Sequence, residues 1–157
     1  MNNFVGSEDN NQDSSLEYRN VTINEAYKIV ISNTFVSRDK VFILDVRTPA
    51  EYNYIHIEGA NLIPLRNLQL YAPVNLSDEE LLAWHIKNNK DLPKNKCTKI
   101  LVYCLSGKRG SIASQMLVDS GYKRVNNIQG GIIEWLNAGY PVVINPNIWI
   151  VNYPKVM

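Results

Sequence analysis

Cys104 is the residue of this sequence that is best placed for covalent chemistry. It follows the apolar run 99–103 and precedes a short loop, 105–110, after which a helical pattern begins. The first N–H groups of a helix have no partners within the helix, so they can bind an anion. Lys108 and Arg109 add positive charge to this loop. These features favour the thiolate over the thiol, so the sequence predicts a nucleophilic cysteine.

The loop after Cys104 also suits a second sulfur atom. A persulfide carries its negative charge one atom beyond the cysteine sulfur, where a ring of amide donors would stabilise it without a metal. Arg109 is expected to offer its planar guanidinium to an oxyanion such as thiosulfate or sulfite. The candidate binding loop consists of Leu105, Ser106, Gly107, Lys108, Arg109 and Gly110. The alternative is a buried structural thiol in a basic turn.

A second group of polar residues follows the apolar run 41–44. We expect Asp45 and Arg47 to lie beside the Cys104 loop. They either orient the loop and bind a substrate anion or form a buried ion pair, and we favour the ion pair. Glu51 is expected to cap a helix or to pair with a neighbouring arginine.

The histidines are assigned structural roles, and Cys97 is not expected to pair with Cys104. His56 is expected to fix a turn through its ring hydrogen bonds, and His85 to pack on a helical face. A strand between Cys97 and Cys104 would span ~23 Å, whereas disulfide partners need Cα atoms within ~7 Å. We therefore expect no disulfide between them and no metal site.

Short apolar runs alternate with helical patterns along the chain. The predicted strands are residues 41–44, 61–63, 99–103 and 125–128. Capping-box sequences begin two predicted helices, at Thr22 and at Ser77, and two more helices are expected after the Cys104 loop and after Gly130. This alternation predicts an α/β fold with a mostly parallel sheet.

The domain boundaries follow from composition. Residues 1–16 have almost no apolar pattern, so we expect a flexible polar tail. Residues 17–157 are expected to form one domain, with a lengthened connection over 66–97 and an extension over 144–157. The connection is interpreted either as a cover that docks a partner or, as we prefer, as an ordinary surface helix.

The composition excludes several classes of protein. The 157 residues are 45% hydrophobic and 20% charged, and 16 Lys and Arg balance 15 Asp and Glu. This is ordinary globular usage, without the basic excess of a nucleic-acid-binding protein. No stretch reaches the ~18 apolar residues that a membrane span needs. We expect a soluble cytoplasmic protein, and the sequence leaves open a leader that has been removed.

Motifs at four places resemble those of the rhodanese sulfurtransferases. Residues 104–109, which read C-x-x-G-x-R, resemble the active loop of that family. The segments DVRTPAEY and HIEGANLIP, at 45–52 and 56–64, are similar to two further family motifs, the second with one residue fewer. Glycines, Trp135 and Pro141 within 121–141 resemble the C-terminal signature. The resemblance covers roughly residues 18–143.

The resemblance implies a rhodanese-like three-layer sandwich, with a mostly parallel five-stranded sheet and helices on both faces. It also implies that Cys104 accepts sulfane sulfur from a donor such as thiosulfate and passes it to a thiol or to cyanide, with ping-pong kinetics. The implied partners are a small anionic sulfur donor and a thiol acceptor, for which a sulfur-carrier protein is one candidate. No cofactor, metal, nucleic acid or membrane is implied.

Other functions are compatible with the same architecture. The first alternative is a rhodanese-like binding or regulatory module with little turnover, although such modules usually lack the cysteine. A cysteine phosphatase or arsenate reductase is less favoured, because those enzymes have a longer loop than the four residues between Cys104 and Arg109. Gly110 departs from the family, which usually has Ser or Ala there, and we expect it to loosen the next helix by up to ~1 kcal/mol.

Overall fold

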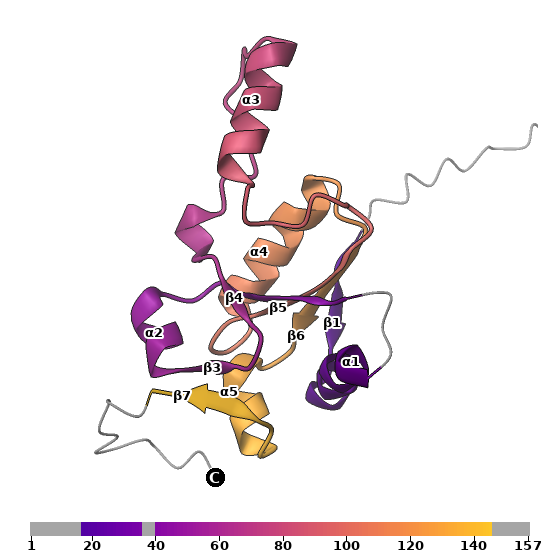
Figure 1. The fold of residues 1–157 in the computed structure, drawn as a ribbon, viewed down its shortest axis with the longest axis vertical. Helices are drawn as coiled ribbons and strands as arrows, with labels where there is room; N and C mark the ends of the chain where they lie inside the picture. Colours follow the sequence, from indigo (N-terminus) through magenta and orange to yellow (C-terminus); the bar gives the residue numbers. More distant parts are fainter. Residues whose placement is uncertain (1–16, 36–39, 146–157) are drawn as a thin grey trace, which may run out of the picture.

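The computed structural model describes residues 17–35 and 40–145 of the chain (Figure 1). The predicted tail 1–16 and most of the predicted extension 144–157 lie outside these described residues. The elements are β1 (Arg19–Val21), α1 (Ile23–Phe35), β2 (Phe42–Asp45), α2 (Pro49–Tyr54), β3 (Ile55–Ile57), β4 (Asn61–Leu62), the 3-10 helix η1 (Leu65–Asn67), α3 (Asp78–Asn88), β5 (Lys99–Tyr103), α4 (Lys108–Asp119), β6 (Arg124–Ile128), α5 (Gly131–Asn137) and β7 (Val142–Ile144).

A five-stranded sheet forms the centre of the structure. Its strand order is β1-β6-β5-β2-β4, and every neighbouring pair is parallel. The middle strand, β5, is apolar and fully buried from Ile100 to Tyr103, as expected of a parallel strand covered on both faces. All four predicted strands are present, and the predicted α/β class is confirmed. Cys104 lies directly after the carboxyl end of β5.

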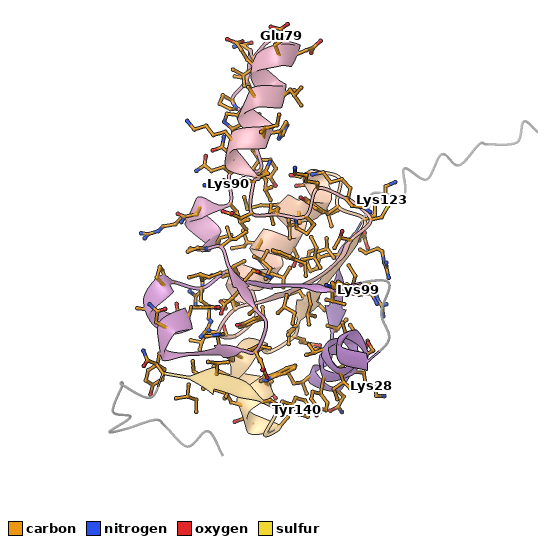
Figure 2. All side chains as sticks on the ribbon, viewed as in Figure 1. Lys28, Glu79, Lys90, Lys99, Lys123 and Tyr140 are labelled. Carbon is orange, nitrogen blue, oxygen red and sulfur yellow. The ribbon has the colours of Figure 1, made fainter. Side chains whose placement is uncertain are left out.

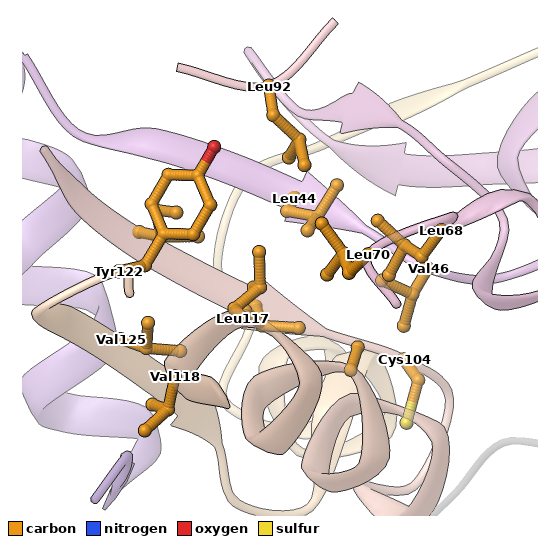
Figure 3. Close-up of a cluster of buried hydrophobic side chains, with 13 residues drawn as sticks. Leu44, Val46, Leu68, Leu70, Leu92, Cys104, Leu117, Val118, Tyr122 and Val125 are labelled. Carbon is orange, nitrogen blue, oxygen red and sulfur yellow. The ribbon is translucent and has the colours of Figure 1, made fainter. Parts of the chain in front are cut away.

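One face of the sheet is covered by α4. Alternate strand residues such as Leu44 and Val102 contribute to this first core, together with Ala113 and Leu117 of α4 (Figure 3). The alternation follows from the strand geometry, in which successive side chains point to opposite faces.

The other face is covered by α1 and α5. The intervening strand residues, such as Ile43 and Leu101, form a second core with Ala26 of α1 and with Ile132 and Trp135 of α5. The structure is therefore a three-layer sandwich with helices on both faces, as the resemblance implies.

Helix α3 projects from this sandwich (Figure 1). It begins at the predicted capping box, in which the Glu80 N–H donates to Ser77 Oγ at 3.3 Å and the Ser77 N–H donates to Glu80 Oε2 at 2.8 Å. None of its residues is buried, and its side chains extend on both sides of the helix (Figure 2). The connection is held to the first core by buried leucines on either side of α3, namely Leu68, Leu70 and Leu92.

Strand β1, the 3-10 helix η1, a small second sheet and helix α2 were not predicted. Strand β3 pairs antiparallel with β7, so that His56 lies opposite Val143. Helix α2 begins after Thr48, whose side chain accepts a hydrogen bond from the Glu51 N–H. These elements are short, which explains why hydrophobic periodicity did not reveal them. In residues 17–35 and 40–145, no helix has the length and hydropathy to cross a membrane.

Candidate active site

The Cys104 side chain lies between the carboxyl end of β5 and the first turn of α4. The Gly107 N–H donates a hydrogen bond to Cys104 Sγ at 3.0 Å. Within the described residues this is the one hydrogen bond that the sulfur accepts. The strand, loop and helix follow one another as predicted, and the ring of donors around the outer sulfur of a persulfide stays a prediction.

Cys104 is fully buried. Its exposed fraction is 0%, and it contributes to the first core, at whose edge Figure 3 shows it. Three of the six loop residues face solvent, among them Leu105, which is 41% exposed, whereas Gly110 is buried. A sulfur donor can therefore reach the sulfur atom only if this loop moves.

Two glycines allow the loop to fold tightly. Gly107 has a φ of 107°, in the left-handed region where a side chain would be strained. Gly131 lies so close to the loop that a Cβ atom there would collide with the carbonyl groups of Cys104 and Leu105. The first turn of α5 also holds the loop directly, because the Ile132 N–H donates to the Cys104 carbonyl oxygen at 2.9 Å.

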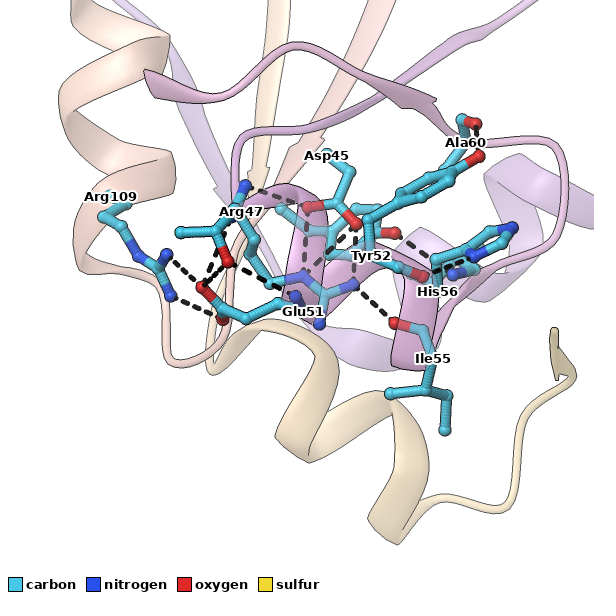
Figure 4. A network of polar contacts seen from close by, with 11 residues as sticks. Asp45, Arg47, Glu51, Tyr52, Ile55, His56, Ala60 and Arg109 are labelled. Carbon is cyan, nitrogen blue, oxygen red and sulfur yellow. Dashed lines mark hydrogen bonds and ion pairs between the residues drawn. The ribbon is translucent and has the colours of Figure 1, made fainter. Parts of the chain in front are cut away.

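Arg109 forms an ion pair with Glu51 (Figure 4). Nη1 donates to Oε1 at 2.6 Å and Nη2 donates to Oε2 at 2.9 Å. The hydrogen bonds from Arg109 are the largest cause that lowers the pKa of Glu51, to about 2. Those same bonds raise the pKa of Arg109, with a smaller contribution from the charge of Cys104.

This ion pair gives Arg109 a partner within the protein. The sequence suggested that its guanidinium binds a substrate oxyanion, and that role stays a prediction, because two of its five N–H donors are bonded to Glu51. Arg109 therefore places positive charge near Cys104 while Glu51 holds its position. The expected pairing of Glu51 with an arginine is present in the structure.

Asp45 and Arg47 form a buried ion pair beneath α2 (Figure 4). Arg47 Nη2 donates to Asp45 Oδ2 at 2.7 Å and to the Ile55 carbonyl oxygen at 2.6 Å. The Arg47 N–H also donates to Asp45 Oδ1, at 3.0 Å. Because these contacts occupy the guanidinium, which is 2% exposed, the pair connects β2 to the start of β3 and is not available to a substrate.

The histidines have structural contacts. His56 stacks on Tyr52 with ring centroids 3.8 Å apart, and its Nδ1 lies 2.8 Å from the Tyr52 carbonyl oxygen (Figure 4). His85 is half-buried, and its Nδ1 lies 3.3 Å from Asn89 Nδ2. Cys97 and Cys104 are both free thiols. In the part of the chain that the structure describes, no group of His, Cys, Asp and Glu could hold a metal.

The sequence analysis missed Asn127, which lies behind the loop. Its Nδ2 donates to Asn20 Oδ1 at 3.1 Å and to the Gly107 carbonyl oxygen at 3.4 Å. Its signal in the sequence was the pair Asn126 and Asn127 within an otherwise apolar strand. Buried polar side chains are uncommon, so this pair merited attention.

The fold and the site define a class of α/β proteins that carry a cysteine loop after the central parallel strand. Among known families, the sequence profile described as "Rhodanese-like domain" matches residues 16–138. The chain belongs to this family.

Several known proteins are similar over most of the chain. A sulfurtransferase of Allochromatium vinosum is 31% identical, covering 77% of this chain and 95% of the relative. A thiosulfate:glutathione sulfurtransferase of Saccharomyces cerevisiae is 31% identical, and the match covers 63% of this chain and 67% of the relative. A tRNA uridine(34) hydroxylase of Streptococcus pyogenes is 32% identical, covering 82% of this chain but 35% of that longer protein. Sulfurtransferases are thus among the relatives, together with an enzyme of another activity.

A solved structure supports the fold. The rhodanese-like domain of an Anabaena protein has a TM-score of 0.60 and 21% identity, and the match covers 85% of this chain and 86% of that one. At this identity the likeness concerns the arrangement of strands and helices only.

Proposed function

We propose that this protein is a sulfurtransferase that carries sulfane sulfur on Cys104 as a persulfide. The observation that carries the proposal is the hydrogen bond from the Gly107 N–H to Cys104 Sγ at 3.0 Å, at the carboxyl end of β5. Ligands in open α/β sheets bind at this end of the strands. The sulfurtransferases among its relatives support the same class of reaction.

The reaction has two steps on one side chain. The Cys104 thiolate attacks the sulfane sulfur of thiosulfate, the S–S bond of the donor breaks, and sulfite leaves with the electron pair. A thiol acceptor then attacks the outer sulfur of the persulfide, which transfers that sulfur and restores the Cys104 thiolate. No oxidant or reductant is consumed, and two half-reactions on one residue give ping-pong kinetics.

The loop supplies the charges for a dianionic donor. Lys108 is exposed, and among the described residues no carboxylate pairs with it. We assign the first contact with the donor to this ammonium group. Arg109, fixed by Glu51, adds positive charge beside the sulfur as sulfite departs. The acceptor is a small thiol or the thiol of a sulfur-carrier protein.

Intact-mass measurement tests the proposal. After incubation with thiosulfate the protein should gain one sulfur atom, ~32 Da, which dithiothreitol removes. The adduct should be absent from Cys104→Ser and should persist in Cys97→Ser, because Cys97 is the other free thiol of the chain. A folded protein that gains no sulfur from thiosulfate or from an organic persulfide would overturn the proposal.

The burial of Cys104 favours a second candidate function. A rhodanese-like binding module with little turnover needs no access to the sulfur, and the exposed fraction of Cys104 is 0%. The same measurement separates the two functions, because a binding module gains no sulfur under conditions in which the sulfurtransferase does.

A further inference from the structure

Asn127 connects the central sheet to the residue that holds the reactive sulfur. It lies on β6, directly behind the loop, and is 2% exposed. Its Nδ2 donates to the carbonyl oxygen of Gly107, the residue whose N–H donates to Cys104 Sγ. The same nitrogen donates to Asn20 Oδ1 on β1. One buried amide therefore links two strands to the sulfur-binding loop.

The contact with Gly107 acts on the N-cap residue of α4, whose carbonyl oxygen also accepts a hydrogen bond from the Ser111 N–H at 2.9 Å. Gly107 has no side chain and a φ of 107°, so its own sterics restrain its backbone angles little. A hydrogen bond to its carbonyl oxygen restrains ψ, the angle that orients this carbonyl group. Because the N–H of the same residue is the donor to Cys104 Sγ, the bond from Asn127 adds to the restraints that set the direction of that donor.

Asn127 also explains the glycine at position 110. Gly110 is buried in the first turn of α4, and its φ is not positive, so backbone conformation does not require glycine there. A Cβ atom at this position would overlap the Asn127 side-chain amide and would lie 3.6 Å from the Cys104 backbone nitrogen. We expected Gly110 to loosen the first turn of α4. That expectation did not take account of Asn127, whose side chain fills the space beside Gly110.

For burial alone, an apolar side chain would be more favourable at position 127 than asparagine. Its Oδ1 is buried and has no hydrogen-bond partner among the described residues. Leaving a buried acceptor unsatisfied is unfavourable, and the apolar neighbours Val125 and Ile128 show what the interior of β6 otherwise contains. The two hydrogen bonds that Nδ2 donates are what distinguishes asparagine from an apolar residue here.

We propose that Asn127 is a positioning residue for the Cys104 loop: it holds Gly107 so that the Gly107 N–H points at the sulfur atom. Gly110 is part of the same arrangement, since it gives the Asn127 amide the space from which to reach the loop. The proposal rests on the proposed function, because it assumes that the sulfur of Cys104 is the reacting atom.

The first test compares two neighbouring asparagines in a Cys97→Ser background. Asn126 is also buried on β6, but its Nδ2 contacts the carbonyl oxygens of Ile100 and Arg124 and not the loop. Asn127→Ala should slow persulfide formation from thiosulfate roughly tenfold, the ratio expected from the loss of about one hydrogen bond. Asn126→Ala should change that rate less than twofold.

The readout that separates positioning from stability is the pH profile of Cys104 alkylation by iodoacetamide. In Asn127→Ala the midpoint of this profile should move to higher pH, since a misdirected Gly107 N–H stabilises the thiolate less. Asn20→Ala removes the exposed hydrogen-bond partner of Asn127 with little risk to folding. It should also move the midpoint to higher pH, by less than Asn127→Ala does. If both variants melt earlier but leave the midpoint unchanged, Asn127 is structural and the proposal is overturned.

The second test concerns the space shared by Gly110 and Asn127. Gly110→Ala should lower the melting temperature in the natural sequence and should lower it much less in the Asn127→Ala background, where the new methyl group has room. Equal losses in the two backgrounds would overturn this part of the proposal. Should the protein form no persulfide at all, the proposed function fails, while the alkylation profile and the melting temperatures still decide the role of Asn127.

Discussion

The carboxylate of Glu51 makes two sets of contacts at once. It accepts the hydrogen bond from the Thr48 N–H that completes the cap of α2, and it binds both terminal nitrogens of Arg109. One residue therefore couples the start of α2 to the first turn of α4 beside Cys104. Its loss should affect both the stability of the fold and the electrostatics of the loop.

Replacing Glu51 with glutamine should make stability less dependent on pH. The pKa of Glu51 is lowered to about 2 in the folded protein, from the ~4.3 of an unperturbed glutamate. A lowered folded-state pKa stabilises the protein above the unfolded-state value, and this stabilisation disappears as the pH falls through the folded-state value. Glu51→Gln should therefore lower the free energy of unfolding most near pH 6, and the difference should shrink between about pH 5 and pH 2.

Urea unfolding at a series of pH values measures this difference. Glu58→Gln is the matched control, because Glu58 is exposed and has no ion pair among the described residues. If the Glu51→Gln deficit were the same at pH 6 and pH 2.5, the ion pair with Arg109 would not be its source.

Residue types and spacing predicted which residues form the site, but not all the contacts that these residues make with distant segments. The order of strand, Cys104 and helix follows from an apolar run that meets a glycine-containing basic loop, and the pairing of Asp45 with Arg47 follows from their placement at a strand end. The bond between Arg109 and Glu51 was only one of two options, since it joins residues from distant segments. Asn127 was missed because its contacts with Gly107 and Asn20 depend on the order of strands in the sheet. That order cannot be inferred from the residues around Asn127.

At the scale of elements, α3 differs from the other long helices. Leu82 and Ile86 on this helix are 62% and 66% exposed, whereas Leu117 of α4 is fully buried. The preferred interpretation of this connection was an ordinary surface helix, and the helix projects from the sandwich (Figure 1). Its local stability comes from the capping box at Ser77 and Glu80.

The same substitution in the two helices should therefore have different costs. Leu82→Ala should change the free energy of unfolding by less than ~0.5 kcal/mol, the usual effect at an exposed position. Leu117→Ala should cost ~2–5 kcal/mol, because it leaves a cavity in the first core. Chemical denaturation of the two variants measures this, and a loss above ~2 kcal/mol in Leu82→Ala would show that α3 packs against the domain in solution.

Element prediction succeeded where periodicity or capping was strong. The strands at 99–103 and 125–128 appear within one residue of their predicted starts, and α3 begins at its capping box. Helix α2 also has a capping box, at Thr48 and Glu51, but its six residues are too few to show a helical period. Among the described residues, strands β3 and β7 pair only with each other, so their formation depends on a contact between distant segments.

At the scale of the whole molecule, the sheet order explains why the site lies where it does. Strand β5 has β2 on one side and β6 on the other, and both of its faces are covered by a core. Cys104 begins the loop at the carboxyl end of β5, and the turn at Gly130 and Gly131, after β6, lies against it. A rigid scaffold of this kind can hold a loop that itself must move to admit a donor.

Native-state hydrogen exchange tests this distribution of stability. Amides of β5 and β6 should exchange slowest, by global unfolding, because their strands are buried and paired on both sides. Amides of α3 should exchange much faster, since local opening of that helix exposes no buried side chain. Amides at Leu105 and Ser106 should be intermediate or fast, as a loop that opens for a donor requires. Equal protection of these loop amides and of β5 would mean that the loop opens only when the whole domain unfolds, and Cys104 would then behave as a structural thiol.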